Sequence, residues 1–247
     1  MTVQKSQWQT KELAASFLEG VRGAMPCADL QLSVIGKIAR HLCKKPKIIL
    51  DLGCGNGILG RYLMGIFPKA LGVFVDFSVP MLDAAWKNLN GSSLARVIKA
   101  DFGNSDWIQA ILPATPFDVV VSGFAIHHQP DARKRAIYSE IYKFLSPGGV
   151  FLNLEHVSSP TSAVEHIFDD FFVDHLFEYH SKLDKTKSRE NVLETYYNRP
   201  DKKENILAPV EDQCQWLREI GFKDVDCFFK IFELSLFGGR KGDGMIL

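Results

Sequence analysis

Short apolar runs alternate with amphipathic stretches along most of the chain. The predicted strands are residues 48–50, 71–75, 96–100, 117–122 and 150–154; Arg96 and Lys99 interrupt the third, and Asp118 lies in the otherwise apolar fourth. Continuous runs of this length are typical of strands buried on both faces of a sheet. The stretches between them that carry apolar residues at helical spacing include residues 58–67, 78–86 and 131–145. This alternation predicts an α/β fold, with a tight turn at Pro147-Gly148-Gly149 before the fifth strand.

The two ends of the pattern differ from its middle. Two amphipathic helices are predicted before the first strand, over residues 12–25 and 29–43. They either pack on the sheet edge or roof a pocket. A further helix, 210–220, is predicted to end at Gly221 and to precede two final strands.

Residues 156–209 interrupt the alternation because they contain no clear buried strand. A segment of this length needs secondary structure of its own. The aromatic-rich stretch 164–180 has helical spacing, and a second helix is predicted near residues 191–198. We therefore expect three regions: an N-terminal helical cap (1–45), a sheet domain (46–155 and 210–240) and a helical lid (156–209).

The most informative stretch is Lys47 to Gly57, KIILDLGCGNG. Gly53, Gly55 and Gly57 follow a buried strand that ends at Asp51, and a helix follows them. Closely spaced glycines let the backbone adopt positive φ and approach a ligand. The start of the helix also presents amide N–H groups that suit a polar or anionic group.

Acidic residues also end the second and third strands. Asp76 ends the second, where an acid can accept hydrogen bonds from ribose hydroxyls, and Asp101-Phe102 ends the third. An acid at either tip could instead be a solvated strand end or cap the next helix. Gly123-Phe124-Ala125-Ile126-His127-His128 follows the fourth strand.

Taken together, these motifs resemble those of the class I S-adenosylmethionine-dependent methyltransferases. The resemblance covers about 110 residues and implies a Rossmann-like, seven-stranded, mostly parallel sheet of order 3-2-1-4-5-7-6 with an antiparallel last strand. It implies S-adenosyl-L-methionine as cofactor and S-adenosyl-L-homocysteine as product. The residues expected to hold the cofactor are Asp51, Gly53, Cys54, Gly55, Asn56, Gly57, Asp76, Phe77, Met81, Asp101, Phe102, Ser122, Gly123 and Phe124.

Methyl transfer is an in-line substitution, so positioning can supply much of the acceleration. A base is needed only when the acceptor must lose a proton. His127 and His128 are the candidates, with His127 slightly favoured; either could instead be structural. Residues expected to contact a small, partly apolar acceptor are Trp8, Phe168, Phe172, Tyr196, Tyr197 and Arg199, although the lid aromatics could simply pack against the sheet domain.

Composition narrows the choice of partners and compartment. The chain has 247 residues, with 29 basic and 29 acidic side chains, so it lacks the basic excess usual in duplex-binding proteins. No apolar run is long enough to span a membrane. The five cysteines are scattered without a C-x-x-C pair, which favours a reducing, cytoplasmic location and predicts neither a disulfide framework nor a metal site. The subunit count stays open, a homodimer included.

Other functions remain open at this stage. The terminal runs, ELAASFLEGVRGAMPCADLQLSVIGKIAR and ENILAPVEDQCQWLREIGFKDVDCFFKIFELSLFGGRK, resemble those of carboxy-S-adenosylmethionine synthases, in which an arginine grips the extra carboxylate. Arg199 lies in about the right region, but Gly55 stands where that family usually has serine. A non-catalytic cofactor-binding protein is another alternative. A nicotinamide oxidoreductase would need a longer glycine spacing, and the amino-methylating Asn-Pro-Pro-Tyr signature is replaced by SGFA.

Overall fold

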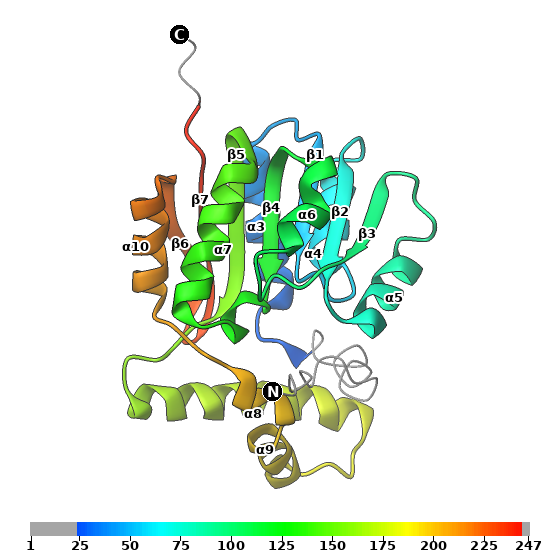
Figure 1. Cartoon of the computed structure of the whole chain (residues 1–247). Coiled ribbons are helices and arrows are strands. Elements are labelled where there is room, and N and C mark those ends of the chain that lie inside the picture. Colours follow the sequence, from blue (N-terminus) through cyan, green and yellow to red (C-terminus); the bar gives the residue numbers. More distant parts are fainter. Residues whose placement is uncertain (1–23, 244–247) are drawn as a thin grey trace, which may run out of the picture.

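One mixed sheet organises the chain (Figure 1). The computed structural model describes residues 24–243. Within that range the strands have the order β3-β2-β1-β4-β5-β7-β6. Their bounds are β1 Ile48–Leu52, β2 Leu71–Asp76, β3 Ala95–Lys99, β4 Phe117–Gly123, β5 Leu145–His156, β6 Lys223–Ile231 and β7 Leu234–Arg240. The first five pair in parallel, and β7 is antiparallel to both β5 and β6. The predicted fold class, strand order included, is confirmed.

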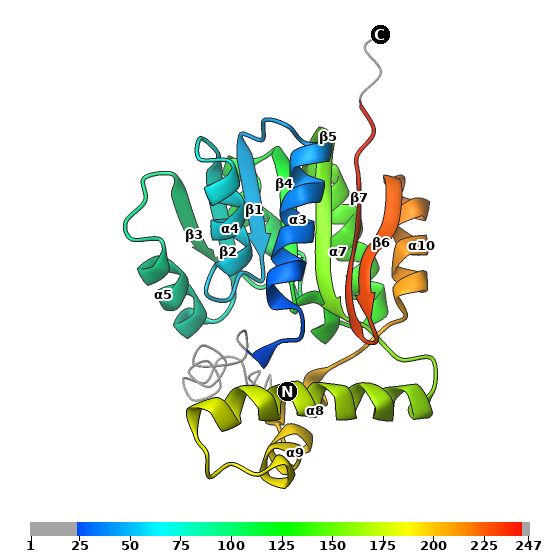
Figure 2. The same cartoon turned by 180° about the vertical axis from the view of Figure 1, so that it is seen from behind.

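Helices cover both faces of this sheet (Figures 1 and 2). On one face lie α3 (Ala28–Leu42), α4 (Ile58–Ile66) and α5 (Val79–Asn88). On the other face lie α6 (Trp107–Ile111), α7 (Asp131–Phe144) and α10 (Val210–Ile220). Short 3-10 turns complete the domain: η3 Leu112–Ala114, η4 Ile126–His128 and η5 Pro200–Glu204. The first predicted helix, 12–25, lies almost entirely outside the described residues, and Trp8 lies outside them altogether.

The buried strands explain why the apolar runs were informative. Successive side chains of a strand point to opposite faces, so Leu50 and Leu52 enter the core beneath α7, whereas Ile49 enters the core beneath α3 and α4. The one acid inside β4, Asp118, is satisfied by the start of β1. Its Oδ2 accepts hydrogen bonds from the N–H groups of Lys47 and Ile48, at 2.7 and 3.0 Å.

The prediction at Pro147-Gly148-Gly149 was wrong in one respect. We expected a turn with the strand beginning after it, but β5 already begins at Leu145, which pairs with Phe117 of β4. Gly148 has φ +75°, and its N–H donates to the carbonyl of Lys241. The turn-forming residues are thus a kink inside a longer strand, because partners on both sides satisfy their backbone groups.

The interrupted segment forms two helices beyond the sheet. Helix α8 (Ser162–Leu183) crosses beneath the end of the sheet at which the parallel strands finish, and α9 (Arg189–Tyr197) folds back against it (Figures 1 and 2). Thr161 caps α8 through Val164 N–H, and Ser188 forms a capping box with Asn191. The chain then returns through η5 to α10. The two helices therefore lie at the edge where an α/β sheet presents its ligand site.

Candidate cofactor and acceptor site

The glycine loop after β1 has the backbone conformation that its sequence predicts. Gly53 and Gly55 have φ values of +65° and +51°. A Cβ added to Gly53 would lie 2.3 Å from the Cβ of Ala125, whereas one added to Gly55 would meet nothing within 4 Å. Gly53 is therefore required by close packing of two loops, and Gly55 borders open space.

Two buried acids hold this loop in place. The Oδ2 atom of Asp51 accepts a hydrogen bond of 2.8 Å from the N–H of Gly60 in α4. Asp76 accepts from Gly55 N–H through Oδ2, at 2.9 Å, and from Ser78 N–H through Oδ1, at 2.8 Å. Burial raises the pKa of Asp76, and these donors partly offset that effect. Asp76 thus joins the tip of β2 to the glycine loop.

A pocket opens between these loops at the carboxyl ends of β1, β2 and β4. It is lined by Asp51, Gly53, Cys54, Gly55, Asn56, Ile58, Leu59, Asp76, Phe77, Ser78, Met81, Phe102, Gly123, Phe124, Ala125 and His128. The lining combines one apolar wall with a buried carboxylate and backbone groups. Burial raises the pKa of the Cys54 thiol well above its ordinary value, so this side chain is a neutral thiol rather than a reactive thiolate.

The two candidate bases occupy different positions. His128 lines the pocket, whereas His127 is buried behind it, and their ring centroids lie 4.0 Å apart. The Nδ1 atom of His128 lies 3.2 Å from the carbonyl oxygen of Glu204. A carbonyl only accepts, so Nδ1 carries the proton and Nε2 is the basic nitrogen. The position of His128, rather than that of the slightly favoured His127, suits a group that meets an acceptor.

Behind the histidines lies a fully buried carboxylate, Glu155, at the end of β5. It accepts hydrogen bonds from the N–H groups of Ile126 and His127, at 2.8 and 3.2 Å, and lies 2.7 Å from His127 Nδ1. Burial raises the pKa of Glu155 to about 7 and lowers the pKa of His127 well below its ordinary value. Removal from water therefore outweighs the attraction between the two groups, and Glu155 mainly fixes the 126–128 turn.

The pH response of His128 follows from its surroundings. Burial, followed by the nearby charge of His127, lowers its pKa from 6.5 to about 4. We expect its imidazole to stay neutral until the pH falls to about 4 in an NMR titration, with the exposed His166 as reference signal. The pKa of His128 is lower in the folded chain than in the unfolded chain. The contribution of His128 to stability is therefore fully present above pH 6.5 and is lost as the pH falls toward 4. His128→Gln should flatten that slope; a midpoint near 6.5 would contradict the expectation.

Comparison with known proteins identifies the fold's family. Residues 49–149 match the family model described as a methyltransferase domain. This part of the chain is a methyltransferase domain. The strand-tip motifs of the sequence lie within or next to this methyltransferase domain, and both resemblances drawn from the sequence are confirmed.

The relatives of the methyltransferase domain fall into two groups. A demethylmenaquinone methyltransferase of Thermus thermophilus is 33% identical over 129 residues, which are 52% of this chain and 56% of that protein. The chain spans about half the length of such relatives. A carboxy-S-adenosyl-L-methionine synthase of Aliivibrio salmonicida is only 25% identical, but over 235 residues, 91% of this chain and 89% of that protein.

Solved structures agree on the fold. An O-methyltransferase family protein from Burkholderia thailandensis has a TM-score of 0.65 and 15% identity, covering 95% of this chain and 60% of that one. Human N-acetylserotonin methyltransferase in complex with S-adenosylmethionine has a TM-score of 0.60 and 16% identity, and the match covers 95% of this chain and 57% of that one. Identities this low support the fold of the methyltransferase domain and nothing finer.

Three residues predicted to hold the cofactor have other partners beside the pocket. Ser122 is fully buried, and its Oγ donates to the carbonyl of Leu52 at 2.8 Å, joining β4 to β1. Gly57 caps α4 and packs against Phe74. Asp101 is exposed and accepts a hydrogen bond of 2.8 Å from the N–H of Gly103. Asp101 therefore stabilises its own turn, whereas the next helix, α6, has Asp106 at its N-cap position.

The predicted acceptor residues other than Trp8, which lies outside the described residues, belong to the lid segment rather than to the pocket wall. Phe168, Phe172 and Tyr196 pack together with Val173, Val192 and Leu234. Tyr197 is 45% exposed. The guanidinium of Arg199 lies 5.0 Å from the Tyr196 ring centroid. Phe168, Phe172 and Tyr196 thus join α8 and α9 to each other and to the sheet domain, because their cluster includes Leu234 of β7 and packs against Phe124.

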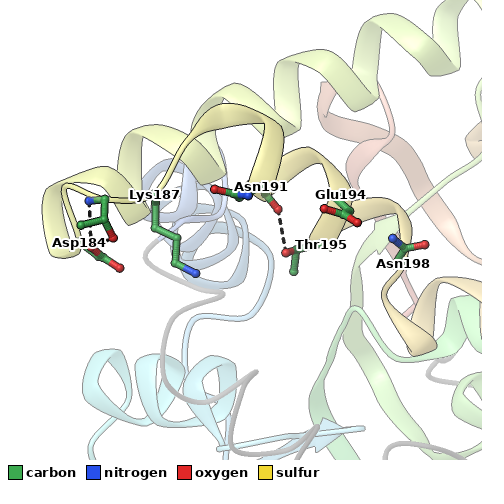
Figure 3. A pocket seen from close by; sticks show the side chains of 7 residues that line it. Asp184, Lys187, Asn191, Glu194, Thr195 and Asn198 are labelled. Carbon is green, nitrogen blue, oxygen red and sulfur yellow. Dashed lines mark hydrogen bonds between the residues drawn. The ribbon is translucent and has the colours of Figure 1, made fainter.

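A second hollow lies on the lid itself (Figure 3). It is lined by Asp184, Thr186, Lys187, Asn191, Glu194, Thr195 and Asn198, all of them exposed. Its polar side chains project from the connection between α8 and α9 and from α9 itself. It lacks the apolar wall of the strand-tip pocket.

One feature behind the methyltransferase pocket was not predicted from the sequence: an ionic and hydrogen-bonded network of Arg133, Glu140 and Trp107, here called the clamp. Arg133 of α7 donates twice to Glu140, at 2.7 Å each, and through Nε to the carbonyl of Phe102 at 2.8 Å. Trp107 Nε1 donates to the same Glu140 at 2.8 Å. The clamp fixes the loop that carries Phe102, a pocket residue. Nothing in the sequence DARKRA distinguishes this arginine from the exposed Arg135.

Proposed function

We propose that the chain transfers a methyl group from S-adenosylmethionine to a small, partly apolar acceptor. The observation that carries this proposal is the strand-tip pocket, in which the glycine loop, Asp76, Phe102 and His128 converge. No helix among the described residues is long and apolar enough to cross a membrane. The expected cytoplasmic location stays a prediction.

The residues of the pocket fit the proposed cofactor. An adenosyl group needs an acceptor for ribose hydroxyls, an apolar wall for the base and close access to the backbone. Asp76 is an acceptor whose oxygens each have a further lone pair, Phe77, Met81 and Phe102 supply apolar surface, and Gly55 leaves open space where a side chain would stand. S-adenosylmethionine supplies the activated methyl group.

The remaining part of the pocket suits the acceptor. Phe124 and Ala125 are apolar, and His128 adds one basic nitrogen. A neutral imidazole can accept a proton from an acceptor hydroxyl, amine or thiol, although its lowered pKa makes it a weak base. We assign to the lid of residues 156–209 the role of excluding water from this end of the sheet, because α8 crosses there (Figure 2).

Isothermal titration calorimetry with S-adenosyl-L-homocysteine tests the binding step directly. We expect saturable binding of one ligand per chain, with adenosine competing for the same site. Methyl transfer from labelled S-adenosylmethionine to a panel of small aromatic hydroxy compounds and quinols then tests the reaction. Absence of saturable binding in the folded protein would contradict the proposal; binding without transfer to any acceptor would favour a non-catalytic role.

A second candidate is an enzyme of the carboxy-S-adenosylmethionine synthase kind. It is favoured by alignment over 91% of the chain and by two cations over one lid tyrosine. Arg199 and Lys202 lie 5.0 and 4.4 Å from the Tyr196 ring centroid, where they could attract an anionic group.

Mass spectrometry of the small molecules that copurify with the chain separates the two candidates. For a methyltransferase we expect S-adenosylmethionine or S-adenosylhomocysteine, because the described residues that line the strand-tip pocket include no lysine or arginine to hold an extra carboxylate. For the synthase we expect the carboxylated cofactor, and Arg199→Met should abolish its copurification while leaving S-adenosylhomocysteine binding intact. Recovery of the carboxylated form would contradict the methyltransferase assignment.

A further inference from the structure

Helix α7 contains a buried lysine, Lys134, whereas Asp131 and Arg135 of the same helix are exposed. Lys134 is 1% exposed. Burying an ammonium group is costly unless it is paired and hydrogen-bonded. Its Nζ donates to Asp131 Oδ1, at 2.7 Å, and to the backbone carbonyl of Ile206. The second contact joins α7 to the segment that returns from the lid, 72 residues further along the chain.

That return segment is attached to the histidine turn as well as to Lys134. The N–H of Ile206 donates to the carbonyl of His127 at 3.0 Å, and the carbonyl of Glu204 accepts from His128 Nδ1 at 3.2 Å. The carbonyl of Ala208 accepts from Ser158 N–H at 3.1 Å. Residues 204–208 therefore lie against the turn that carries His128, and Lys134 holds them there from the other side.

We propose that Lys134 is a positioning residue: by holding residues 204–208 against the His127–His128 turn, it keeps Glu204 where its carbonyl orients the His128 imidazole and couples that imidazole to the lid. The Lys134–Ile206 contact thus supports the two hydrogen bonds that join the lid to the histidine turn. Its effect on turnover rests on the proposed methyltransferase function, but its effect on His128 does not.

The surroundings favour an orienting role over a general structural one. Lys134 contributes, with burial, to lowering the pKa of His127, so its charge is felt at the turn. The carbonyl that it holds lies two residues from the one that receives the His128 proton. Loss of the ammonium should therefore loosen the partner that fixes the His128 tautomer, without touching the glycine loop.

The experiment compares Lys134→Met with wild type by nitrogen NMR of the His128 ring and by amide hydrogen exchange. In wild type we expect the proton on Nδ1. In Lys134→Met we expect a shift toward the Nε2-protonated tautomer and exchange at the Ile206 amide faster by about fivefold or more, the change expected for losing one hydrogen bond of ordinary strength. Affinity for S-adenosylhomocysteine should change less than about twofold, because Lys134 does not line the pocket.

Two further variants make the result decisive. Arg135→Met removes the same charge from the next position of α7, where the side chain is 54% exposed and pairs with Glu219; it should leave the His128 tautomer and Ile206 exchange unchanged. Asp131→Asn, at an exposed partner of Lys134, should shift both readouts in the same direction by a smaller amount, and it carries the test if Lys134→Met does not fold. A folded Lys134→Met variant, or a folded Asp131→Asn variant where Lys134→Met does not fold, with wild-type tautomer and exchange would overturn the proposal, even if its thermal stability fell.

Discussion

Replacing Asp76 by asparagine should weaken binding of S-adenosylhomocysteine by roughly 100-fold, measured by isothermal titration calorimetry. The carboxylate is 6% exposed and accepts from the N–H groups of Gly55 and Ser78. Asparagine keeps the shape but must present an NH₂ group to one of these donors or to the ligand. A lost hydrogen bond to a charged group is worth about 1.5–3 kcal/mol, and one such loss near the upper end of that range gives about 100-fold.

Two other acids serve as controls for this prediction. Asp83 is exposed on α5, and Asp83→Asn should leave the affinity unchanged. Asp101→Asn should cost less than about fivefold, because Asp101 is exposed and already accepts from Gly103 N–H. An affinity of Asp76→Asn within threefold of wild type, in a protein with a wild-type unfolding curve, would remove Asp76 from the site.

Alanine at two glycines of the same loop should have opposite consequences. In Gly53→Ala the new Cβ lies 2.3 Å from that of Ala125, at φ +65°. Overpacking of about 1–3 kcal/mol and left-handed strain of about 1–2 kcal/mol add, so we expect the free energy of unfolding to fall by roughly 3–4 kcal/mol. Gly55→Ala adds only the left-handed strain, because its Cβ meets nothing within 4 Å, so its free energy of unfolding should fall by only about 1–2 kcal/mol.

Binding should show the reverse order of sensitivity. The Cβ of Gly55→Ala would occupy the open space of the pocket. Because a buried ligand surface tolerates little overpacking, the affinity of this variant for S-adenosylhomocysteine should fall at least about tenfold. Urea unfolding and calorimetry on the pair check both statements. Equal stability losses, or full affinity in Gly55→Ala, would place the ligand elsewhere than over the glycine loop.

Much of the site was predictable because local sequence determined local shape. The run Ile48–Leu50 had to be a buried strand, and the glycines behind it had to form a turn with positive φ. Asp76 was found because an acid directly after an apolar run marks the end of a parallel strand. His127 and His128 were predicted together as candidate bases, with His127 slightly favoured, but it is His128 that lines the pocket. Adjacent residues in a turn point in different directions, and sequence alone gives no direction.

Other features depended on contacts between distant segments. Glu155 could be seen as a strand-end acid, yet its role at the 126–128 turn required β5 to lie beside β4. The lid aromatics could be assigned to a helix, but whether they faced a pocket or each other depended on how α8 and α9 pack. Arg133 and Lys134 are adjacent in a charged stretch, and only the surrounding elements decide which direction each one takes.

By itself, the sequence of this protein determined the order of strands and helices, the glycine loop and the acids at the strand tips. These depend on periodicity and backbone freedom, which act over a few residues. The tertiary structure decided which side chains reach the pocket: Asp76, Phe102 and His128 do, whereas Ser122, Asp101 and the lid aromatics have other partners. The physical reason is that burial and hydrogen bonding are settled between segments far apart in the chain, after the sheet has brought them together.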